Sequence, residues 1–270
     1  MENSKEPVLL AQNIKDIEIQ ANSQKHNSSL MEKAGLEIAI HARELSADKK
    51  KGTILILIGP GNNGVDALIA AFHLKSWWFH VTVFLPLGRK PEDLVLTRQL
   101  NKWVQAGGKV IGDIESNTEI NLVIDGIFGI GLNKIITGKL SSIIKQINNL
   151  ECNILSIDTP SGIDSDTGTV MGVAIKATHT LTFIGNKTGL YMNSGGDHAG
   201  IITVRKRGTK DLDLGPSHGY LISGQNIKSA IKKRDINSHK GMFGKVLIIG
   251  GAEGMHGATI LAGRAAIKLG

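Results

Sequence analysis

The sequence LIGPGNNGVDALIAA, residues 57–71, indicates the fold class. It begins inside an apolar run, Thr53–Ile58, that is typical of a strand buried on both faces. Glycine and proline at 59–61 end this run in a tight turn. A helical pattern of apolar residues follows over Val65–Lys75. The stretch therefore predicts a strand, a turn and a helix, which is the repeating unit of a parallel α/β sheet.

The same alternation continues along the chain. Further strands are predicted at His80–Leu85, Leu122–Asp125, Ile154–Asp158, His179–Phe183 and Gly200–Val204. Helices are predicted from Ala11 to about Glu44, at Pro91–Ala106 and at Ser141–Asn149. Strands that alternate with helices form a parallel sheet with helices on both faces. We therefore expect a Rossmann-like three-layer α/β/α sandwich with a mostly parallel sheet.

The pattern stops and then restarts near the end of the chain. Residues 208–237 are polar and rich in turn formers, and a strand pattern at Lys245–Ile249 and a helical pattern at Ala258–Leu269 follow. One strand and one helix cannot bury their own apolar faces. We therefore expect a first domain at 1–215, a linker at 216–238, and the truncated β-α opening of a second domain at 239–270.

Composition narrows the class of protein. The chain has 31 Lys and Arg residues against 24 Asp and Glu, and its net charge is +7. The basic clusters Lys49–Lys51, Arg205–Arg207 and Lys232–Arg234 are not interleaved with aromatic residues, which make up only 4% of the chain. We interpret these clusters as solvated surface and expect no nucleic-acid partner.

Cysteine content and hydropathy indicate the compartment. Cys152 is the only cysteine, so no intrachain disulfide can form, as is usual in a reducing cytosol. The start, MENSKEPVLL, has no apolar stretch of signal-peptide length. No run approaches the ~20 apolar residues of a membrane helix. We expect a cytoplasmic protein without a membrane partner.

Three loops that follow predicted strands carry polar residues. They are GPGNNGVD (59–66), DGIFGIGLNK (125–134) and DTPSGIDSDTG (158–168). The first lacks the Gly-Lys-Ser/Thr of a phosphate loop and fits GxGxxG only in part. Taken alone, each loop is equally an ordinary turn with local caps. Because the carboxyl ends of parallel strands meet at one edge, however, we expect all three loops to form one site.

Together the loops would gather oxygen ligands without any Cys or His. The side chains concerned are Asn63, Asp66, Asp125, Asp158, Ser161 and Asp164. Such a set suits a hard cation better than zinc. A carboxylate in the same pocket is also suited to proton transfer.

Five motifs, in this order, resemble those of the NAD(P)H-hydrate epimerases. They are SSLMEKAG (28–35), GPGNNGVD (59–66), DGIFGIGL (125–132), IDTPSGIDSDTG (157–168) and HTLTFIGNKTGL (179–190). The later stretch HKGMFGKVLIIGGAEGMHGATILAGRAA (239–266) resembles the beginning of the ADP- or ATP-dependent NAD(P)H-hydrate dehydratase. That ribokinase-like domain is often fused to the epimerase in bacteria. The resemblance spans nearly the whole chain.

The resemblance implies an isomerase of nicotinamide nucleotide repair. Such enzymes interconvert the R and S forms of hydrated NADH and NADPH. A dehydratase, as a separate protein or as the remaining domain, then removes water from the S form. The Gly-rich motif ending in Asp that serves the dehydratase reaction is absent from these 270 residues, so we expect no lyase activity from this chain. The sequence does not decide between a monomer and a homodimer.

The resemblance also implies roles for individual residues. A potassium ion (K⁺) would be held by Asn63, Asp125 and Ser161. Asp158, at the end of a strand, is the expected catalytic acid/base. The expected substrate contacts are Asn62, Asn63, Gly64, Val65, Asp66, Gly129, Ile130, Gly131, Leu132, Asn133, Lys134, Ile135 and Asp158.

The chain departs from the family motifs at a few positions. Val65 and Ala67 stand where the family has glycines, Ile130 replaces a threonine, and Lys134-Ile135 replaces Arg-Pro. A positive φ at Val65 would cost about 1–3 kcal/mol, and its methyl groups would crowd a ligand that comes close. Two alternatives to an active epimerase therefore stay open. One is a nucleotide-binding protein without catalysis, such as a decaying gene fragment; the other, a different α/β enzyme such as a sugar kinase, lacks its downstream motifs.

Overall fold

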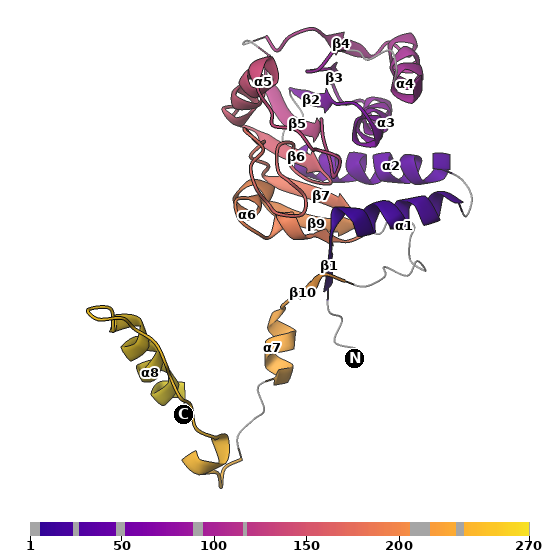
Figure 1. Ribbon diagram of the computed structural model, residues 1–270. Helices are drawn as coiled ribbons and strands as arrows, with labels where there is room; N and C mark the ends of the chain where they lie inside the picture. The colour runs from indigo at the N-terminus through magenta and orange to yellow at the C-terminus, as the bar shows by residue number, and fades with distance from the viewer. Residues whose placement is uncertain are drawn as a thin grey trace. The chain divides into compact units, whose positions relative to one another are not determined.

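The computed structural model describes residues 6–23, 27–46, 52–88, 94–115, 118–205, 217–230 and 235–269. The chain divides into two compact units. The first spans Ser4–Leu221, and the second contains Ile222–Gly270. Figure 1 shows both units, coloured from the N-terminus to the C-terminus.

The first unit is built around a seven-stranded sheet with the order β4-β3-β2-β5-β6-β7-β9. Its strands are β2 (Thr53–Ile58), β3 (Val81–Phe84), β4 (Lys109–Ile111), β5 (Ile120–Gly126), β6 (Asn153–Ile157), β7 (His179–Phe183) and β9 (Ile201–Arg205). Every neighbouring pair is parallel. The predicted Rossmann-like parallel sheet is therefore confirmed, although the three-residue strand β4 was not predicted.

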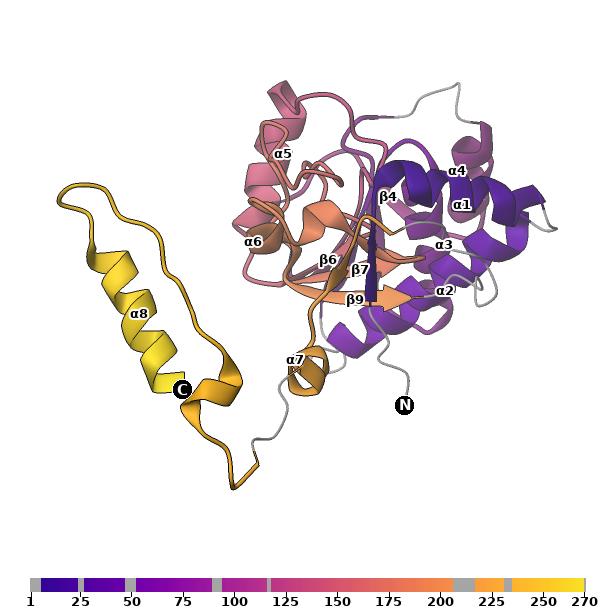
Figure 2. The same cartoon turned by 60° about the horizontal axis from the view of Figure 1, so that its bottom comes forward.

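Helices cover both faces of this sheet (Figures 1 and 2). They are α1 (Ala11–Ser23), α2 (Asn27–Ser46), α3 (Asn62–Ser76), α4 (Leu94–Gln105), α5 (Gly138–Asn148) and the short α6 (Gly195–Ala199). Strand β2 shows why two layers form, because its side chains alternate between faces. Ile54, Ile56 and Ile58 pack into the core beneath α1 to α4, whereas Leu55 and Leu57 pack into a second core with α5.

A second, smaller sheet has the order β10-β1-β8. It consists of β1 (Glu6–Leu9), β8 (Asn186–Lys187) and β10 (Gly219–Leu221), none of which was predicted. β1 runs parallel to β8, with Leu9 opposite Lys187, and antiparallel to β10. β10 lies within the segment 216–238 that the sequence indicated as linker. The 3₁₀ helix η1 (Thr188–Leu190) follows β8 directly.

Helix α3 begins earlier than its hydropathy pattern predicts. The pattern begins at Val65, but the helix begins at Asn62, after Gly61 with a φ of 90°. This positive φ favours glycine, which allows the strand to turn directly into the helix. As a result Asn62 and Asn63 belong to the first helical turn rather than to a loop. The region predicted as helical from Ala11 to about Glu44 consists of two helices, α1 and α2.

The second unit contains α7 (Gly224–Ala230), the 3₁₀ helix η2 (Lys240–Phe243) and α8 (Gly257–Leu269). The helix predicted at Ala258–Leu269 is confirmed, but the strand predicted at Lys245–Ile249 is wrong. A strand requires a neighbour for its backbone hydrogen bonds, and the described residues 235–269 contain none. No residue of α8 is buried. The assignment of 239–270 to a ribokinase-like domain stays a prediction.

Some predictions fall outside the described residues. These are the basic clusters at 49–51 and 232–234, positions 206 and 207, and the first residues of the helix predicted from Pro91. In the part of the chain that the structure describes, no helix is long and apolar enough to cross a membrane.

Candidate active site

A cavity of about 400 Å³ lies at the carboxyl edge of the seven-stranded sheet. This volume falls within the range of about 300–1,000 Å³ that is common for small-molecule sites. Its walls come from the ends of β2, β5, β6 and β7 and from α1. The lining residues are Ile14, Lys15, Glu18, Pro60, Gly61, Asn62, Asn63, Asp66, Phe128, Gly129, Ile130, Gly131, Asp158, Phe183 and Ile184. The three loops predicted to form one site all contribute.

The part of the first predicted loop that lines the cavity is one face of the first turns of α3. Asn62, Asn63 and Asp66 line the cavity, as expected for residues three or four positions apart on a helix. Val65 and Ala67 lie on other faces of α3 and are buried in the apolar core. Val65 is not among the four described non-glycine residues with positive φ. The two substitutions of family glycines therefore neither strain this loop nor fill the cavity.

Close backbone packing explains two glycines of the first loop, Gly59 and Gly64. A Cβ added at Gly59 would lie 1.7 Å from the carbonyl oxygen of Ile127, on the second loop. A Cβ at Gly64 would lie 1.9 Å from the carbonyl oxygen of Gly59. Gly64 is therefore a packing residue and does not line the cavity, although it was an expected substrate contact.

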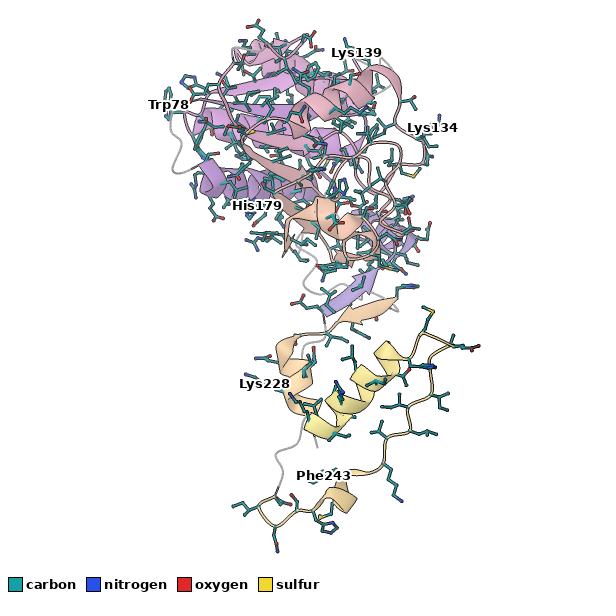
Figure 3. All side chains as sticks on the ribbon, turned by 90° about the vertical axis from the view of Figure 1, so that its left-hand side faces the viewer. Trp78, Lys134, Lys139, His179, Lys228 and Phe243 are labelled. Carbon is teal, nitrogen blue, oxygen red and sulfur yellow. The ribbon has the colours of Figure 1, made fainter. Side chains whose placement is uncertain are left out.

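The second loop reaches the cavity only with its first part. Gly129, Ile130 and Gly131 line it. The other expected substrate contacts, Leu132, Asn133, Lys134 and Ile135, do not, and Lys134 lies exposed on the outside of this loop (Figure 3). A Cβ added at Gly129 would lie 3.4 Å from both Asp158 Oδ2 and the Asn63 side-chain carbon Cγ. The missing side chain thus leaves open the space in front of these two polar groups.

Asp125, near the end of β5, is completely buried beneath the cavity. Its carboxylate accepts hydrogen bonds from Ser156 Oγ (2.8 Å), Ser161 Oγ (2.6 Å) and the backbone N–H groups of Ser161 (2.9 Å) and Ile127 (3.3 Å). Burial raises the pKa of Asp125, and these hydrogen bonds oppose the shift. All four donors are neutral, and no ion pair among the described residues involves Asp125.

The other two expected K⁺ ligands meet beside Asp125. Asn63 Nδ2 donates to the carbonyl oxygens of Phe128 (3.0 Å) and Ile157 (3.2 Å). Ser161 Oγ, besides bonding Asp125, accepts a hydrogen bond from the Phe128 N–H (2.9 Å) and lies 3.3 Å from the Phe128 carbonyl oxygen. The structure therefore brings Asn63, Asp125 and Ser161 together around two backbone carbonyls, and every group in this cluster carries oxygen.

Asp158 follows directly after β6 and has a φ of 69°, which is rare for a residue other than glycine. Its Oδ1 accepts from Thr182 Oγ1 (3.3 Å), from the Phe183 N–H (3.4 Å) and from Lys187 Nζ. Its Oδ2 faces the open space at Gly129. The side chain is 16% exposed. One carboxylate oxygen is therefore held by the protein while the other is turned toward the cavity.

Lys187 is a site residue that the sequence motifs did not single out. Its side chain has no solvent exposure, and it donates to Asp158 Oδ1, Thr182 Oγ1 (2.6 Å) and the Phe183 carbonyl oxygen (2.8 Å). The available signal was a single lysine within the motif HTLTFIGNKTGL (179–190), which is otherwise free of charged residues apart from a histidine. The cavity residues Ile14, Lys15 and Glu18 on α1 were also missed, because they belong to none of the motifs.

Asp164 does not belong to the site, contrary to expectation. Its Oδ1 accepts from the backbone N–H groups of Asp166 (3.1 Å) and Thr167 (2.8 Å) and from Thr167 Oγ1 (2.8 Å). Asp164 is not among the residues that line the cavity. A short-range cap of this kind is the common role of an aspartate in a turn.

Comparison with known proteins identifies the relatives of this chain. The chain is 37% identical over 247 residues to the bifunctional NAD(P)H-hydrate repair enzyme Nnr of Dictyoglomus turgidum, an alignment that covers 89% of this chain and 48% of that protein. It is 39% identical over 168 residues to the NAD(P)H-hydrate epimerase of Achromobacter xylosoxidans, covering 62% of this chain and 81% of that protein. The chain thus spans about half the length of the bifunctional relatives.

A crystal structure of the yeast protein YNL200c has the same fold. It superposes with a TM-score of 0.64 at 20% sequence identity and covers 81% of this chain and 98% of the yeast chain. Residues 27–189 match the family model described as YjeF-related protein N-terminus. The resemblance to the NAD(P)H-hydrate epimerases is confirmed, and the chain belongs to the family of YjeF-related N-terminal domains.

Proposed function

We propose that this chain is an isomerase that interconverts the R and S forms of hydrated NADH and NADPH. The observation that carries the proposal is the orientation of Asp158, whose Oδ2 faces a cavity while Oδ1 is held by Lys187. The relative that supports the substrate is the Achromobacter xylosoxidans epimerase, because this chain covers most of it. The three polar residues of α3 that line the cavity, Asn62, Asn63 and Asp66, also support an active site.

The chemistry follows from the substrate. Water that adds to the enamine double bond of a dihydropyridine leaves its hydroxyl on the carbon beside the ring nitrogen. When Asp158 Oδ2 takes the hydroxyl proton, the oxygen forms a carbonyl and the carbon–nitrogen bond breaks, with its electron pair going to nitrogen. Attack of the nitrogen on the other face of that carbonyl re-forms the carbon–nitrogen bond, and Asp158 returns the proton to oxygen. The configuration is inverted without any net oxidation or loss of water.

The lining of the cavity suits such a ring. Ile14, Phe128 and Phe183 supply apolar walls. Asn62, Asn63 and Asp66 supply polar groups from one side of α3, and Gly129 to Gly131 leave space opposite them. An apolar pocket with a few converging polar groups is the usual form of a small-molecule site.

A potassium ion fits the cluster beneath the cavity. Asp125 is a buried carboxylate whose four hydrogen-bond donors are all neutral, so a cation would balance its charge. The surrounding groups carry oxygen, and the described residues contain no His, Cys, Asp and Glu cluster of the kind that binds transition metals. We propose Asn63, Asp125 and Ser161 as the ligands, with the Asn63 amide turned so that its oxygen faces the ion. The bound ion would supply positive charge beside the substrate pocket.

Potassium can be tested by thermal unfolding. Replacing choline chloride by potassium chloride at equal ionic strength should raise the unfolding temperature, with a stabilisation of about 2.7 kcal/mol once the ion is at 100 times its dissociation constant. The Asp125→Asn variant should lose this difference between the two salts. An equal effect of potassium on both proteins would refute the site.

We also propose that residues 239–270 begin a dehydratase domain, as the twofold length of the bifunctional relatives supports. The S form made here would be consumed by that domain or by a separate dehydratase. The single cysteine supports a reducing, cytoplasmic setting. Val65 and Ala67 lie outside the cavity and Ile130 lines it, so Ile130 is the one of these three departures that still supports a binding protein without catalysis.

The proposed activity can be measured directly. The R form of hydrated NADH is supplied with an excess of a separate S-specific dehydratase and ATP, and the return of NADH absorbance is followed with and without this chain. We expect the chain to accelerate NADH recovery well above the spontaneous rate of epimerisation. Recovery at the spontaneous rate, from protein that is folded by circular dichroism, would favour the binding protein.

A further inference from the structure

We propose that Lys187 is a positioning residue that divides the work between the two oxygens of Asp158. Lys187 would hold Oδ1 in place and leave Oδ2 as the atom that transfers the proton. The inference rests on the proposed epimerase function. It goes beyond it by assigning to a buried lysine the control over which of the two Asp158 oxygens reacts.

The contacts of Lys187 argue against a direct part in proton transfer. An ammonium group has three N–H donors, and Lys187 has three acceptors: Asp158 Oδ1, Thr182 Oγ1 and the Phe183 carbonyl oxygen. The side chain is completely buried and does not line the cavity. A lysine whose three hydrogens are all directed into the protein has none to offer a substrate.

The contacts of Asp158 show what Lys187 holds. Asp158 has a left-handed backbone, and so does Ile184, which also lines the cavity with a φ of 71°. Such conformations are unfavourable for residues other than glycine and persist where surrounding contacts determine them. Lys187 provides that determination, because one ammonium group joins the residue after β6 to Thr182 and Phe183 at the end of β7.

Lys187 reaches Asp158 from the small sheet, because it lies on strand β8. Strand β8 pairs with β1, where Lys187 lies opposite Leu9, and Thr188 Oγ1 donates to the Leu9 carbonyl oxygen at 3.3 Å. The lysine backbone is therefore fixed independently of the cavity loops. Its ammonium group then fixes Oδ1, so the carboxylate has one defined orientation, with Oδ2 toward Gly129 and Asn63.

A double-mutant cycle tests this arrangement. Lys187→Met keeps an unbranched side chain of similar shape and removes the ammonium group with its charge, so we expect kcat to fall by about 100-fold while KM changes less than about threefold. In an Asp158→Asn background the same substitution should lower kcat by less than about threefold, since residues that act as one unit are not additive. Losses that multiply, or a Lys187→Met enzyme with normal kcat, would overturn the proposal.

A second variant covers the case in which Lys187→Met does not fold. Thr182→Val keeps the side-chain shape but removes one acceptor of Lys187 and one donor to Asp158. Its matched control is Thr180→Val on the same strand, where the buried hydroxyl donates to the Ala199 carbonyl oxygen at 2.6 Å. We expect a loss of kcat of about tenfold in Thr182→Val only. Equal kcat in both variants would overturn the proposal.

A structural measurement separates this inference from the proposed reaction. In a crystal structure of Lys187→Met, or of Thr182→Val, we expect the Asp158 carboxylate to turn so that Oδ2 no longer faces Gly129. This result would support positioning even if the wild-type chain showed no epimerase activity. An unchanged carboxylate would overturn it even if the activity fell.

Discussion

Residues other than glycine adopt the left-handed conformation at both edges of the seven-stranded sheet. At the carboxyl edge they are Asp158, with a φ of 69°, and Ile184, with a φ of 71°, and at the amino edge Trp78 has a φ of 66°. Asp158 is held by Lys187, Thr182 and the Phe183 backbone. Trp78 is 92% exposed and stands out from the surface (Figure 3). The same local strain is thus supported by side-chain contacts at one edge and not at the other.

The left-handed backbones of Trp78 and Asp158 have different causes. Trp78 follows the last turn of α3, where its N–H bonds the Lys75 carbonyl oxygen (3.0 Å) and the Phe79 N–H bonds that of Leu74 (3.1 Å). This is the Schellman pattern of a helix end, in which glycine is the usual left-handed residue. At Asp158 no helix ends, and the conformation instead aims a carboxylate at a cavity. Strain of this kind therefore points to a candidate site only where contacts hold a reactive group in place.

The first prediction concerns Asp158 at the carboxyl edge, where we expect the greatest loss of activity. Asp158→Asn cannot accept the hydroxyl proton, so we expect kcat for epimerisation to fall by about 10³-fold, within the usual range for a lost acid/base. The measurement is the coupled recovery of NADH from the R form. The matched control is Asp164→Asn in the same loop, whose amide oxygen still accepts the local hydrogen bonds, so kcat should stay within about threefold. Full activity in Asp158→Asn with normal KM would show that another group transfers the proton.

The second prediction concerns the helix that joins the two edges. Val65→Gly removes a buried side chain from the core and places glycine in α3, so we expect a loss of about 2–4 kcal/mol in the free energy of unfolding. Urea denaturation measures this loss. Restoring the family residue on the cavity side, by Ile130→Thr, should instead change KM with little effect on stability. If Val65→Gly raised kcat/KM and left stability unchanged, Val65 would lie against the substrate after all.

The sequence predicts the elements that have a local apolar pattern. It does not predict those that depend on contacts with distant parts of the chain. The buried strands repeat an apolar pattern over five to seven residues, so the parallel sheet and its polar edge followed from pattern alone. Strand β8 has only two residues and is too short for a pattern. Lys245–Ile249 has the pattern of a strand but no partner among the described residues 235–269. Local sequence cannot report whether a partner is present.

In the candidate site, too, the residues at the ends of predicted strands were predictable, and those positioned by distant contacts were not. Asn63, Asp125, Asp158 and Ser161 lie at or just after the ends of predicted strands, and that position was enough to expect them together. Lys187 reaches Asp158 from 29 residues further along the chain, through a strand held by β1. The outward or inward direction of Val65 depends on where α3 begins, and hydropathy placed that start three residues late. Both errors concern geometry that arises only when distant segments pack.

The third prediction concerns pH at the amino edge. His41 on α2 lies 6.1 Å, between ring centroids, from His179 at the start of β7. Burial lowers the pKa of His41; Glu44 and Glu37 oppose this shift, whereas His179 and Arg205 add to it. Neither ring nitrogen has a hydrogen-bond partner, and Nδ1 lies 3.6 Å from Glu44. A buried imidazole without partners favours its neutral form.

The sign of the pH effect follows from that shift. Because the folded pKa is below the unfolded one, the contribution of His41 to stability is complete above the unfolded value of about 6.5 and is lost as pH falls through the folded value. Each unit of separation is worth about 1.4 kcal/mol. We expect His41→Phe to unfold less readily in mild acid, relative to neutral pH, than the wild type does. Identical pH dependence in the two proteins would exclude His41 as the cause.

The fourth prediction concerns Trp78, where the expected change in stability is small. Trp78→Gly should stabilise the protein by about 0.5–1 kcal/mol, because glycine adopts the left-handed conformation freely and a residue that is 92% exposed has little burial to lose. Trp77→Gly is the neighbouring control and should destabilise, since its φ is −91° and its ring contacts the Arg43 guanidinium at 4.9 Å.

The corresponding change at the other edge should have the opposite sign. Asp158→Gly relieves the same backbone strain, but it leaves the buried ammonium group of Lys187 without its carboxylate partner. Loss of one member of a buried ion pair typically costs about 3–5 kcal/mol, which exceeds the strain of about 1–3 kcal/mol that is relieved. Thermal unfolding of the two glycine variants should therefore move in opposite directions. If both variants were stabilised, Lys187 would not depend on Asp158, and the contrast between a supported and an unsupported strained residue would fail.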